Sequence, residues 1–547
     1  MTVFKKLLSI NTFFVIIAAL ITIPSFYRML RPGIYSMQDF QLFRLFEFDK
    51  CVKDFQIPCR WTPDAGLGYG EPVFNFYGQV PFVIGEAFHF LGFNIINSFK
   101  LVFISSLAGS ALTMFFLAKK LWKNNFAALI SSAVYVYAPY RALDVWVRGV
   151  PNESLGFVIF PLLFLSLENY IEKERVSSLI SFSLLLSLLV LTHNLSVILF
   201  LPVLVIWTFY RLFTKKKWKL LVGISGGILL TFLVSSFYLL PVIFEAKYVD
   251  IQSTISGYFD FRGHFAALYQ LLISRFWGYG GSVFGPEDGL SLSVGHLQWI
   301  LPMIVLVTIL IKKKFGEYKD VIIFVLLGWF LLLLTHNKST FFWEITPAMA
   351  YIQFPWRFLG PATFSFALAS GVVANLYKNQ KLFLSVVIIS AAILLNFSFF
   401  KEDIWYKVTD SYFTGGEEWN RQRAASIGDF WPKFGGVIPA SPASENPQDG
   451  RLITKKTNLF SYNLNTKDKK EVELPVNYFP GWQAKVNGKD YKIYPGKTGL
   501  ITLIFPGGEG RVDLIFKDTP IRILGNIISL IGVLTILFLG IRYRHEA

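Results

Sequence analysis

The sequence predicts an all-α polytopic membrane protein of about twelve transmembrane helices, with a small external antiparallel β domain before the last helix. Of the 547 residues, 53% are hydrophobic and only 16% are charged, whereas soluble proteins have about a quarter charged residues. Many apolar runs are close to 20 residues long, the length that crosses a bilayer. Near residue 455 the pattern changes to short alternating strands separated by turn residues.

The apolar runs give the expected membrane spans in order. The first, 8–27, follows Lys5 and Lys6 and lacks a small-x-small cleavage site, so we interpret it as a retained signal anchor. The segment 78–95 is expected to be re-entrant or interfacial. The remaining spans are expected at 98–118, 126–142, 153–170, 177–192, 195–212, 220–240, 297–312, 320–336, 357–376, 382–400 and 521–541.

Lysine placement predicts the orientation of these spans. Short loops that carry lysines favour the cytoplasmic side of a membrane, and the clusters fall in alternate loops: Lys5–Lys6, Lys119–Lys120, Lys215–Lys217 and Lys312–Lys314, with Arg542 and Arg544 after the last run. Both termini are therefore expected to be cytoplasmic. The long loops, which alone can hold a site, are then external: 29–97, 241–296, 337–356 and 401–520.

Three regions follow from this pattern. Residues 1–400 form a transmembrane domain with external loops, 401–520 form an external linker and β-sandwich-like domain, and 521–547 form the final helix and a cytoplasmic tail. Within the β domain, Asn487 and Gly488 stand where a tight hairpin turn requires positive φ. The part up to about residue 455 is expected to be an extended linker.

The two cysteines, Cys51 and Cys59, share the first external loop. Disulfides persist outside the cytoplasm, so a bridge is expected, with two unpaired thiols as the alternative. The net charge of +16 does not indicate nucleic acid, because no basic soluble domain is present. The six histidines nowhere reach metal-ligand spacing, and the central spans lack the acids and histidines that ion-coupled transporters use.

Ionisable residues gather instead at the expected outer boundary. Guanidinium groups bind phosphate through paired hydrogen bonds, so arginines there suggest a lipid phosphate or pyrophosphate ligand, with ordinary salt bridges as the alternative. The tetrapeptide LTHN occurs twice at outer helix ends, and its histidines could contact phosphate or could cap helices. The candidate substrate-binding residues are Arg44, Arg141, Arg148, Glu153, His193, His336 and Arg357.

Asp39 is the candidate catalytic residue. It stands among aromatic residues, shortly after the first span. A carboxylate there could act as a general base on a membrane-borne substrate. The alternative is structural, because Ser36 followed by Asp39 three residues later loosely fits a capping box at a helix start.

The chain resembles two groups of membrane proteins. An acid, Asp39, in the first external loop (29–97, called loop one below), together with about a dozen spans, resembles the pattern of the GT-C superfamily of glycosyltransferases. The stretches DFQLFRLFEF, GYGEPVFNFYGQVPF, YAPYR, RGVPNESLGF, LTHNLS and QFPWRF resemble bacterial membrane proteins labelled 6-pyruvoyl-tetrahydropterin-synthase-related, over about residues 35–370. The C-terminal YFPGWQAKVNGKDYKIY and TPIRILGNIISLIG resemble bacterial membrane proteins linked to teichoic-acid glycosylation.

The GT-C resemblance implies a function. It makes Asp39 the base in the transfer of a sugar from a polyprenyl-phosphate donor to an envelope glycan or protein acceptor, at the bacterial cytoplasmic membrane. Many GT-C members carry two adjacent acids where this chain has a lone one, which favours the base role; no cofactor is expected, although a divalent metal stays open. The alternatives are a non-catalytic envelope-assembly protein and a lipid-linked glycan transporter. Nucleic acid is not an expected partner.

Overall fold

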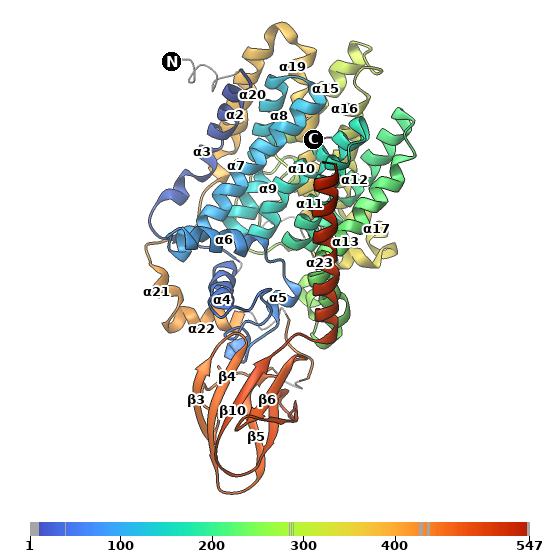
Figure 1. Cartoon of the computed structure of the whole chain (residues 1–547). Helices are drawn as coiled ribbons and strands as arrows, with labels where there is room; N and C mark the ends of the chain where they lie inside the picture. Colours follow the sequence, from blue (N-terminus) through green and yellow to red (C-terminus); the bar gives the residue numbers. More distant parts are fainter. Residues whose placement is uncertain are drawn as a thin grey trace, which may run out of the picture.

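The chain folds into a helical bundle and a β domain that projects from one end of it (Figure 1). The structure is a computed structural model, and it describes residues 10–38, 40–283, 285, 287, 289–425, 430–434 and 438–543. The two largest apolar cores lie inside the bundle, and a third lies mainly in the β domain. Helices therefore dominate the fold, as the composition predicts.

Twenty-two α-helices are described. They are α2 (Ile10–Leu20), α3 (Ile23–Phe26), α4 (Gln41–Lys53), α5 (Val73–Phe76), α6 (Val80–Phe90), α7 (Ile95–Trp122), α8 (Asn125–Val136), α9 (Pro139–Ala142), α10 (Pro151–Lys173), α11 (Val176–Thr192), α12 (Asn194–Lys215), α13 (Leu220–Glu245), α14 (Leu268–Leu272), α15 (His296–Ile311), α16 (Lys319–Leu334), α17 (Thr340–Ile345), α18 (Leu359–Gly371), α19 (Val373–Leu376), α20 (Lys381–Asn396), α21 (Asp410–Phe413), α22 (Gly416–Ala425) and α23 (Pro520–Arg542).

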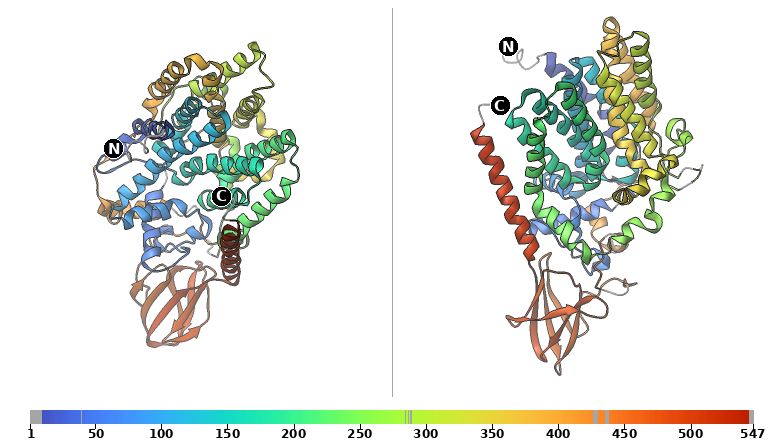
Figure 2. Two further views of the ribbon diagram at one scale, coloured as in Figure 1. Left: turned by 45° about the horizontal axis from the view of Figure 1, so that its top comes forward. Right: turned by 90° about the vertical axis from the view of Figure 1, so that its right-hand side faces the viewer.

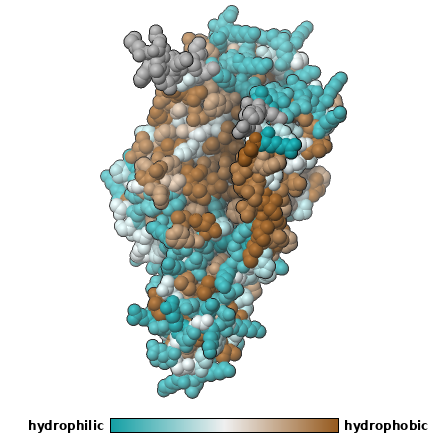
Figure 3. Space-filling model, viewed as in Figure 1, coloured by the Kyte–Doolittle hydropathy of each residue, from teal (hydrophilic) through white to brown (hydrophobic). Residues whose placement is uncertain are grey.

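The expected twelve spans are not confirmed. Among the described residues, eight helices are long and apolar enough to cross a membrane, or nine if α16 and α17, which meet at a 92° bend, count as one broken span. The expected spans 126–142, 177–192 and 297–312 coincide with α8, α11 and α15, which are apolar but shorter. The bundle is thus a multi-pass membrane domain, and apolar side chains cover its middle in Figure 3 while hydrophilic ones gather at its two ends.

The last helix, α23, leads from the β domain back along the bundle. It packs mainly on α13, where Gly525 and Gly532 let the two backbones approach closely: a Cβ on Gly525 would lie 2.7 Å from the carbonyl oxygen of Ser236. The start of α2 and the far end of α23 both lie toward the end of the bundle opposite the β domain, as Figure 1 and Figure 2 show.

The β domain is a sandwich of two antiparallel sheets. Its core contains Phe460, Val472, Leu503 and Val512, which come from strands of both sheets. One sheet has the order β3-β4-β10-β6-β7 and the other β5-β9-β8. The strands are β3 (Gly450–Lys455), β4 (Leu459–Thr466), β5 (Lys470–Asn477), β6 (Trp482–Val486), β7 (Lys489–Tyr491), β8 (Ile493–Pro495), β9 (Leu500–Phe505) and β10 (Gly508–Phe516).

The hairpin between β6 and β7 follows the sequence-based expectation. Asn487 and Gly488 have φ of 48° and 81°, the left-handed conformations that a two-residue turn of this kind requires. The neighbouring strands pair antiparallel from Val486 and Lys489 outward. Strand β3, in contrast, lies in a stretch that was expected to be linker.

The segment 401–449 is more structured than an extended linker. Strand β2 (Trp405–Tyr406) pairs with β1 (Ile34–Tyr35), and α21 and α22 follow it. Asp410 fixes α21 to the bundle, because its carboxylate accepts the backbone N–H groups of Ile95 and Ile96 at 2.8 and 3.1 Å. The segment therefore returns to the start of loop one and packs beside it.

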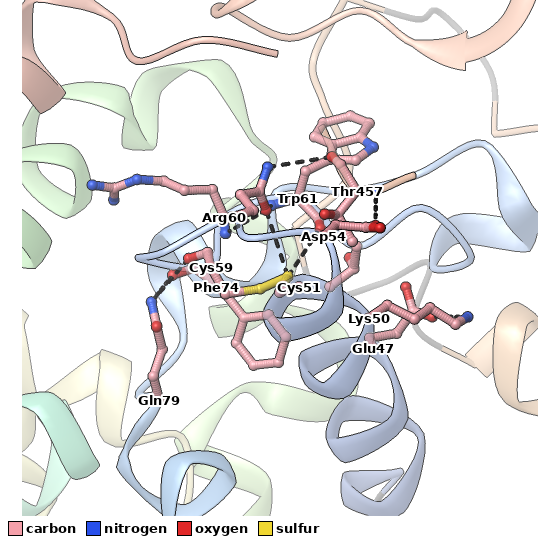
Figure 4. The surroundings of a disulfide bond; sticks show 12 residues. Glu47, Lys50, Cys51, Asp54, Cys59, Arg60, Trp61, Phe74, Gln79 and Thr457 are labelled. Atoms are coloured by element: carbon pink, nitrogen blue, oxygen red, sulfur yellow. Dashed lines mark hydrogen bonds and ion pairs between the residues drawn. A yellow bond between two sulfur atoms is a disulfide. The ribbon is translucent and has the colours of Figure 1, made fainter. Parts of the chain in front are cut away.

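A disulfide lies in the part of loop one that contacts the β domain. Cys51 at the end of α4 is bonded to Cys59, and both are buried. Around it, Gln79 donates to the carbonyl oxygen of Cys59 at 3.0 Å, and Asp54 accepts the N–H of Thr457 at 2.7 Å (Figure 4). The bridge thus fixes the part of loop one that contacts the β domain.

Replacing both cysteines by serine is expected to lower the free energy of unfolding by about 2–3 kcal/mol, because the bridge closes a short loop and restricts the unfolded chain. Thermal unfolding of the wild-type and Cys51→Ser/Cys59→Ser proteins measures this difference. Mass spectrometry of unreduced protein is the control, and two free thiols in protein purified without reductant would contradict the assignment.

Candidate functional site

A cavity of about 880 Å³ lies at the end of the bundle that carries the β domain. The starts of α4, α10 and α12 and the last turns of α13 meet there, together with loops from the second half of the bundle. Its described polar lining consists of Gln38, Arg44, Tyr77, Arg148, Asn152, His193, Asn194, Thr254, Tyr258, Ser282, Tyr351, Gln353, Trp356 and Arg357. Three arginines and no carboxylate are among the described lining residues.

Arg148 reaches the cavity from a π-helical segment, Leu143–Arg148, an irregularity that often marks a functional site. One guanidinium nitrogen donates to Asp144 at 2.9 Å and to Glu153 at 2.8 Å. Tyr140 donates its hydroxyl to the other oxygen of Glu153. All these side chains are buried, so the two carboxylates hold Arg148 in one orientation.

Arg357 lies in the turn Pro355–Phe358 that precedes α18, and it is 8% exposed. Its Nη1 donates to the carbonyl oxygen of Ile352 at 2.8 Å and to Oε1 of Gln353 at 3.0 Å. Its Nε has no partner among the described residues, and no ion pair is described for it. Gln353 has a φ of 65°, and strain of this kind in a residue with a side chain is typical of ligand sites.

Arg44, on α4, lines the cavity, and its guanidinium lies over the ring of Tyr77 at 4.3 Å. Asp39, the candidate base, lies outside the described residues, but its chain neighbours Gln38 and Phe40 both line this cavity. The N–H of Gln38 donates to the carbonyl oxygen of Val147 at 3.0 Å. The segment that leads to Asp39 is therefore fixed to the segment that carries Arg148.

The close approach of these two segments depends on a glycine. Gly149 has a φ of 68°, and a Cβ on it would lie 2.6 Å from the sulfur of Met37. Only glycine adopts this conformation without cost and leaves room for Met37.

The structure contradicts the capping-box interpretation of Ser36 and Asp39. Helix α4 begins at Gln41, and its N-cap residue is Phe40 rather than Ser36. The hydroxyl of Ser36 instead accepts the N–H of Ile404 at 3.2 Å. Ser36 therefore joins loop one to the segment before β2.

His193 lies between α11 and α12 and lines the cavity. Burial lowers the pKa of His193 to about 4; Glu153 opposes this shift, and Arg357 and Arg148 add to it. The ring is consequently neutral at pH 7 and serves as a hydrogen-bonding group. Its Nδ1 lies 2.8 Å from the hydroxyl of Ser196.

Three of the candidate substrate-binding residues are not in the cavity lining: Glu153, which pairs with Arg148, and Arg141 and His336. Arg141 is fully buried behind it, with its guanidinium over the ring of Phe157 at 4.0 Å and 3.9 Å from the carboxylate of Asp144. His336 caps the turn after α16, where its Nδ1 accepts the N–H of Lys338 at 3.1 Å. These contacts match the alternatives of salt bridging and helix capping.

Several lining residues are not among the candidates expected from the sequence, although some stand in the motifs quoted above. Asn152, in RGVPNES, donates to the carbonyl oxygens of Gly78 and Thr192 and thereby joins three segments of the wall. Trp356, in QFPWRF, lies under the guanidinium of Arg148 at 4.9 Å. Gln353 is the first residue of the same motif, whereas Tyr258 had no comparable signal, because it comes from an irregular loop.

The cavity combines positive charge with an apolar wall. Arg148 is paired with two carboxylates, whereas no ion pair is described for Arg357; a buried guanidinium of the second kind at the surface of a cavity favours an anionic ligand. The apolar lining residues are Phe40, Phe76, Val150, Leu195, Val242, Ile251, Phe259, Leu290, Phe354, Ala425 and Phe430. Within the described ranges, no group of three or more His, Cys, Asp or Glu residues is arranged to hold a metal ion.

The fold and this cavity define a multi-pass membrane protein with a site suited to an anionic ligand. Residues 74–402, more than half of the chain, match the family described as "6-pyruvoyl-tetrahydropterin synthase related domain; membrane protein", and the chain belongs to this family.

The chain is also similar to a protein of Lactococcus lactis subsp. cremoris (strain MG1363) that is described as uncharacterized. The two are 24% identical over 295 residues, 50% of this chain and 47% of that protein. The chain thus spans about half the length of this curated relative. No solved structure matches the chain, and the GT-C resemblance stays a prediction.

Proposed function

We propose that the protein is a membrane glycosyltransferase that moves a sugar from a polyprenyl-phosphate donor to a cell-envelope acceptor. The observation that carries this proposal is Arg357, a buried guanidinium with no described ion pair, which lines one cavity together with Arg44 and Arg148. Gln38 and Phe40, the chain neighbours of the candidate base Asp39, lie in the same wall.

The proposed reaction needs a base and a stabilised leaving group. The acceptor hydroxyl gives its proton to Asp39 as its oxygen forms a bond to the anomeric carbon. The bond from that carbon to the phosphate oxygen breaks, and the lipid phosphate leaves with the electron pair. Arg148 and Arg357, held in place by their described partners, stabilise the charge that develops on the phosphate.

The apolar lining favours a lipid-linked phosphate over a soluble one. Leu195, at the start of α12, and Val242, near the end of α13, line the cavity, and both helices carry candidate membrane spans. A ligand whose head is anionic and whose tail is apolar would satisfy both parts of the lining.

We further propose that the protein lies in the bacterial cytoplasmic membrane, with both termini cytoplasmic and the β domain external. Three observations support this orientation: the lysine-rich loops, the position of the start of α2 and the far end of α23 away from the β domain (Figure 2), and the disulfide in the part of loop one that contacts the β domain. The eight spans, the bent pair and α8, α11 and α15 would together make twelve crossing segments.

Arg357→Lys is expected to weaken the binding of polyprenyl phosphate about tenfold, because lysine keeps the charge but loses the paired hydrogen bonds to phosphate. Binding is measured with purified protein in lipid nanodiscs. The matched control is Arg262→Lys, which changes an exposed arginine that is paired with Asp260 and should bind like the wild type. Equal affinity in Arg357→Lys and wild-type proteins would contradict the proposal.

A further inference from the structure

The cavity lined by Arg44, Arg148 and Arg357 is called the arginine cavity below. A second pocket, of about 230 Å³, shares Phe40 with this cavity. It lies between the start of loop one and the segment that carries β2, α21 and α22. Its described polar lining consists of Tyr35, Ser36, Tyr406, Tyr412, Glu418, Arg421 and Gln422. Because Phe40 lines both spaces, ligands in the two would lie on either side of one side chain.

The pocket is chemically different from the arginine cavity. Nε and Nη2 of Arg421 donate to the two oxygens of Glu418 at 2.8 and 2.6 Å, so the one positive and the one negative group among its described lining residues neutralise each other. The guanidinium of Arg421 also lies over the ring of Phe40 at 5.5 Å. An anion would find no unpaired charge there.

The composition of this pocket fits a sugar. Each hydroxyl of a sugar both donates and accepts hydrogen bonds. In the pocket, the carboxylate accepts hydrogen bonds, the guanidinium and amide groups donate them, and the tyrosine hydroxyls do both. The rings of Tyr406 and Tyr412 add aromatic surface, and ligand pockets typically combine such surface with a few fixed polar groups. A neutral, hydroxyl-rich ligand uses all of these groups.

The walls of the pocket are fixed on both sides. Ile34 and Tyr35 pair with Tyr406 and Trp405 across β1 and β2. On α22, Trp419 packs on Phe43 of α4 with ring centroids 5.2 Å apart. These contacts hold the two walls of the pocket in place and join loop one to the segment that carries β2 and α22.

We propose that this pocket binds a sugar unit of the acceptor, and that Phe40 separates it from the donor in the arginine cavity. The acceptor role rests on the proposed function, whereas sugar binding itself can be tested without any transfer. The arrangement would place an acceptor hydroxyl next to the segment that carries Asp39.

Saturation-transfer NMR with the full-length protein tests the proposal. The probes are methyl glucoside, methyl galactoside and methyl N-acetylglucosaminide, and the protein is held in lipid nanodiscs because sugar-based detergents would compete. At least one probe is expected to bind saturably, and Glu418→Gln is expected to weaken that binding at least about fivefold, since a charged acceptor is lost. Tyr412→Ala, which changes an exposed residue, is a second variant with the same expectation.

The matched control is Glu417→Gln, which changes the neighbouring exposed acid of α22 and should bind sugar like the wild type. Saturable binding that is equal in wild-type, Glu418→Gln and Tyr412→Ala proteins, or no saturable binding of any probe, would overturn the proposal. Arg357→Lys separates it from the proposed function: this variant should keep sugar binding while it loses lipid-phosphate affinity. Sugar binding that depends on Glu418, in a protein that binds no lipid phosphate, would refute only the proposed donor.

Discussion

Asp39→Asn is expected to lower the rate of sugar transfer by about 10²–10⁴-fold, because asparagine keeps the shape of the side chain but cannot take the proton of the acceptor hydroxyl. The binding of polyprenyl phosphate is expected to be largely retained, since the proposed phosphate ligands are Arg148 and Arg357. Release of polyprenyl phosphate from a set of polyprenyl-phosphate hexoses, with protein in liposomes, measures the rate.

Two controls make the result specific to the base role. Asp403→Asn changes an exposed acid of the same segment as β2 and should transfer like the wild type. The melting temperature shows whether the Asp39→Asn protein is as stable as the wild type, and thus separates a loss of chemistry from a loss of folding. A folded Asp39→Asn protein with an unchanged transfer rate would refute the catalytic role.

The same experiment decides between the proposed function and its alternatives. A wild-type protein that binds polyprenyl phosphate but transfers no sugar from any donor would favour a non-catalytic envelope-assembly protein. Movement of the intact lipid-linked sugar across the liposome membrane would favour a transporter. Transfer that depends on Asp39 would exclude both.

The helices of the bundle were predictable because each depends on its own run of apolar residues. Their lengths were less so. The expected span 126–142 ends early, since α8 stops at Val136 and Pro139 begins a new short helix; proline has no N–H to continue the earlier one. Helix α22 was not predicted, because its sequence GEEWNRQRAA is polar and it depends on the contact of Trp419 with loop one.

The kind of ligand that the candidate site favours could be predicted from the sequence, but the residues that line the site could be predicted only in part. Arginines beside apolar runs indicated an anion site, and three of the four predicted arginines do line one cavity. The sequence could not separate them from Arg141, because the difference lies in which face of a helix end meets the cavity. It also could not separate His193 from His336, which share the tetrapeptide LTHN but lie at helix ends with different neighbours.

Glu245→Ala is expected to destabilise the protein by about 3–5 kcal/mol, because it leaves the buried guanidinium of Arg522 without its counter-ion. Glu245 ends α13, and Arg522 lies in the first turn of α23; their side chains are 2% and 0% exposed, with Nη2 of Arg522 2.9 Å from Oε2 of Glu245. Glu245 also accepts from Asn75 at 2.7 Å and from Thr519 at 2.6 Å. The pair thus joins loop one, α13 and the linker between the β domain and α23.

A double-mutant cycle tests whether the pair acts as a unit. Glu245→Leu and Arg522→Met are each expected to destabilise the protein, whereas the double variant Glu245→Leu/Arg522→Met should recover much of the loss, since no buried charge is then unpaired. The control Asp490→Ala changes an acid that is 88% exposed and 3.9 Å from Lys485, and it should leave the melting temperature unchanged. Because Asn75 directly precedes Phe76 and Tyr77 of the cavity wall, Glu245→Ala should also weaken lipid-phosphate binding, which Asp490→Ala should not. Single variants as stable as the wild type would show that the β domain and α23 are held by apolar packing alone.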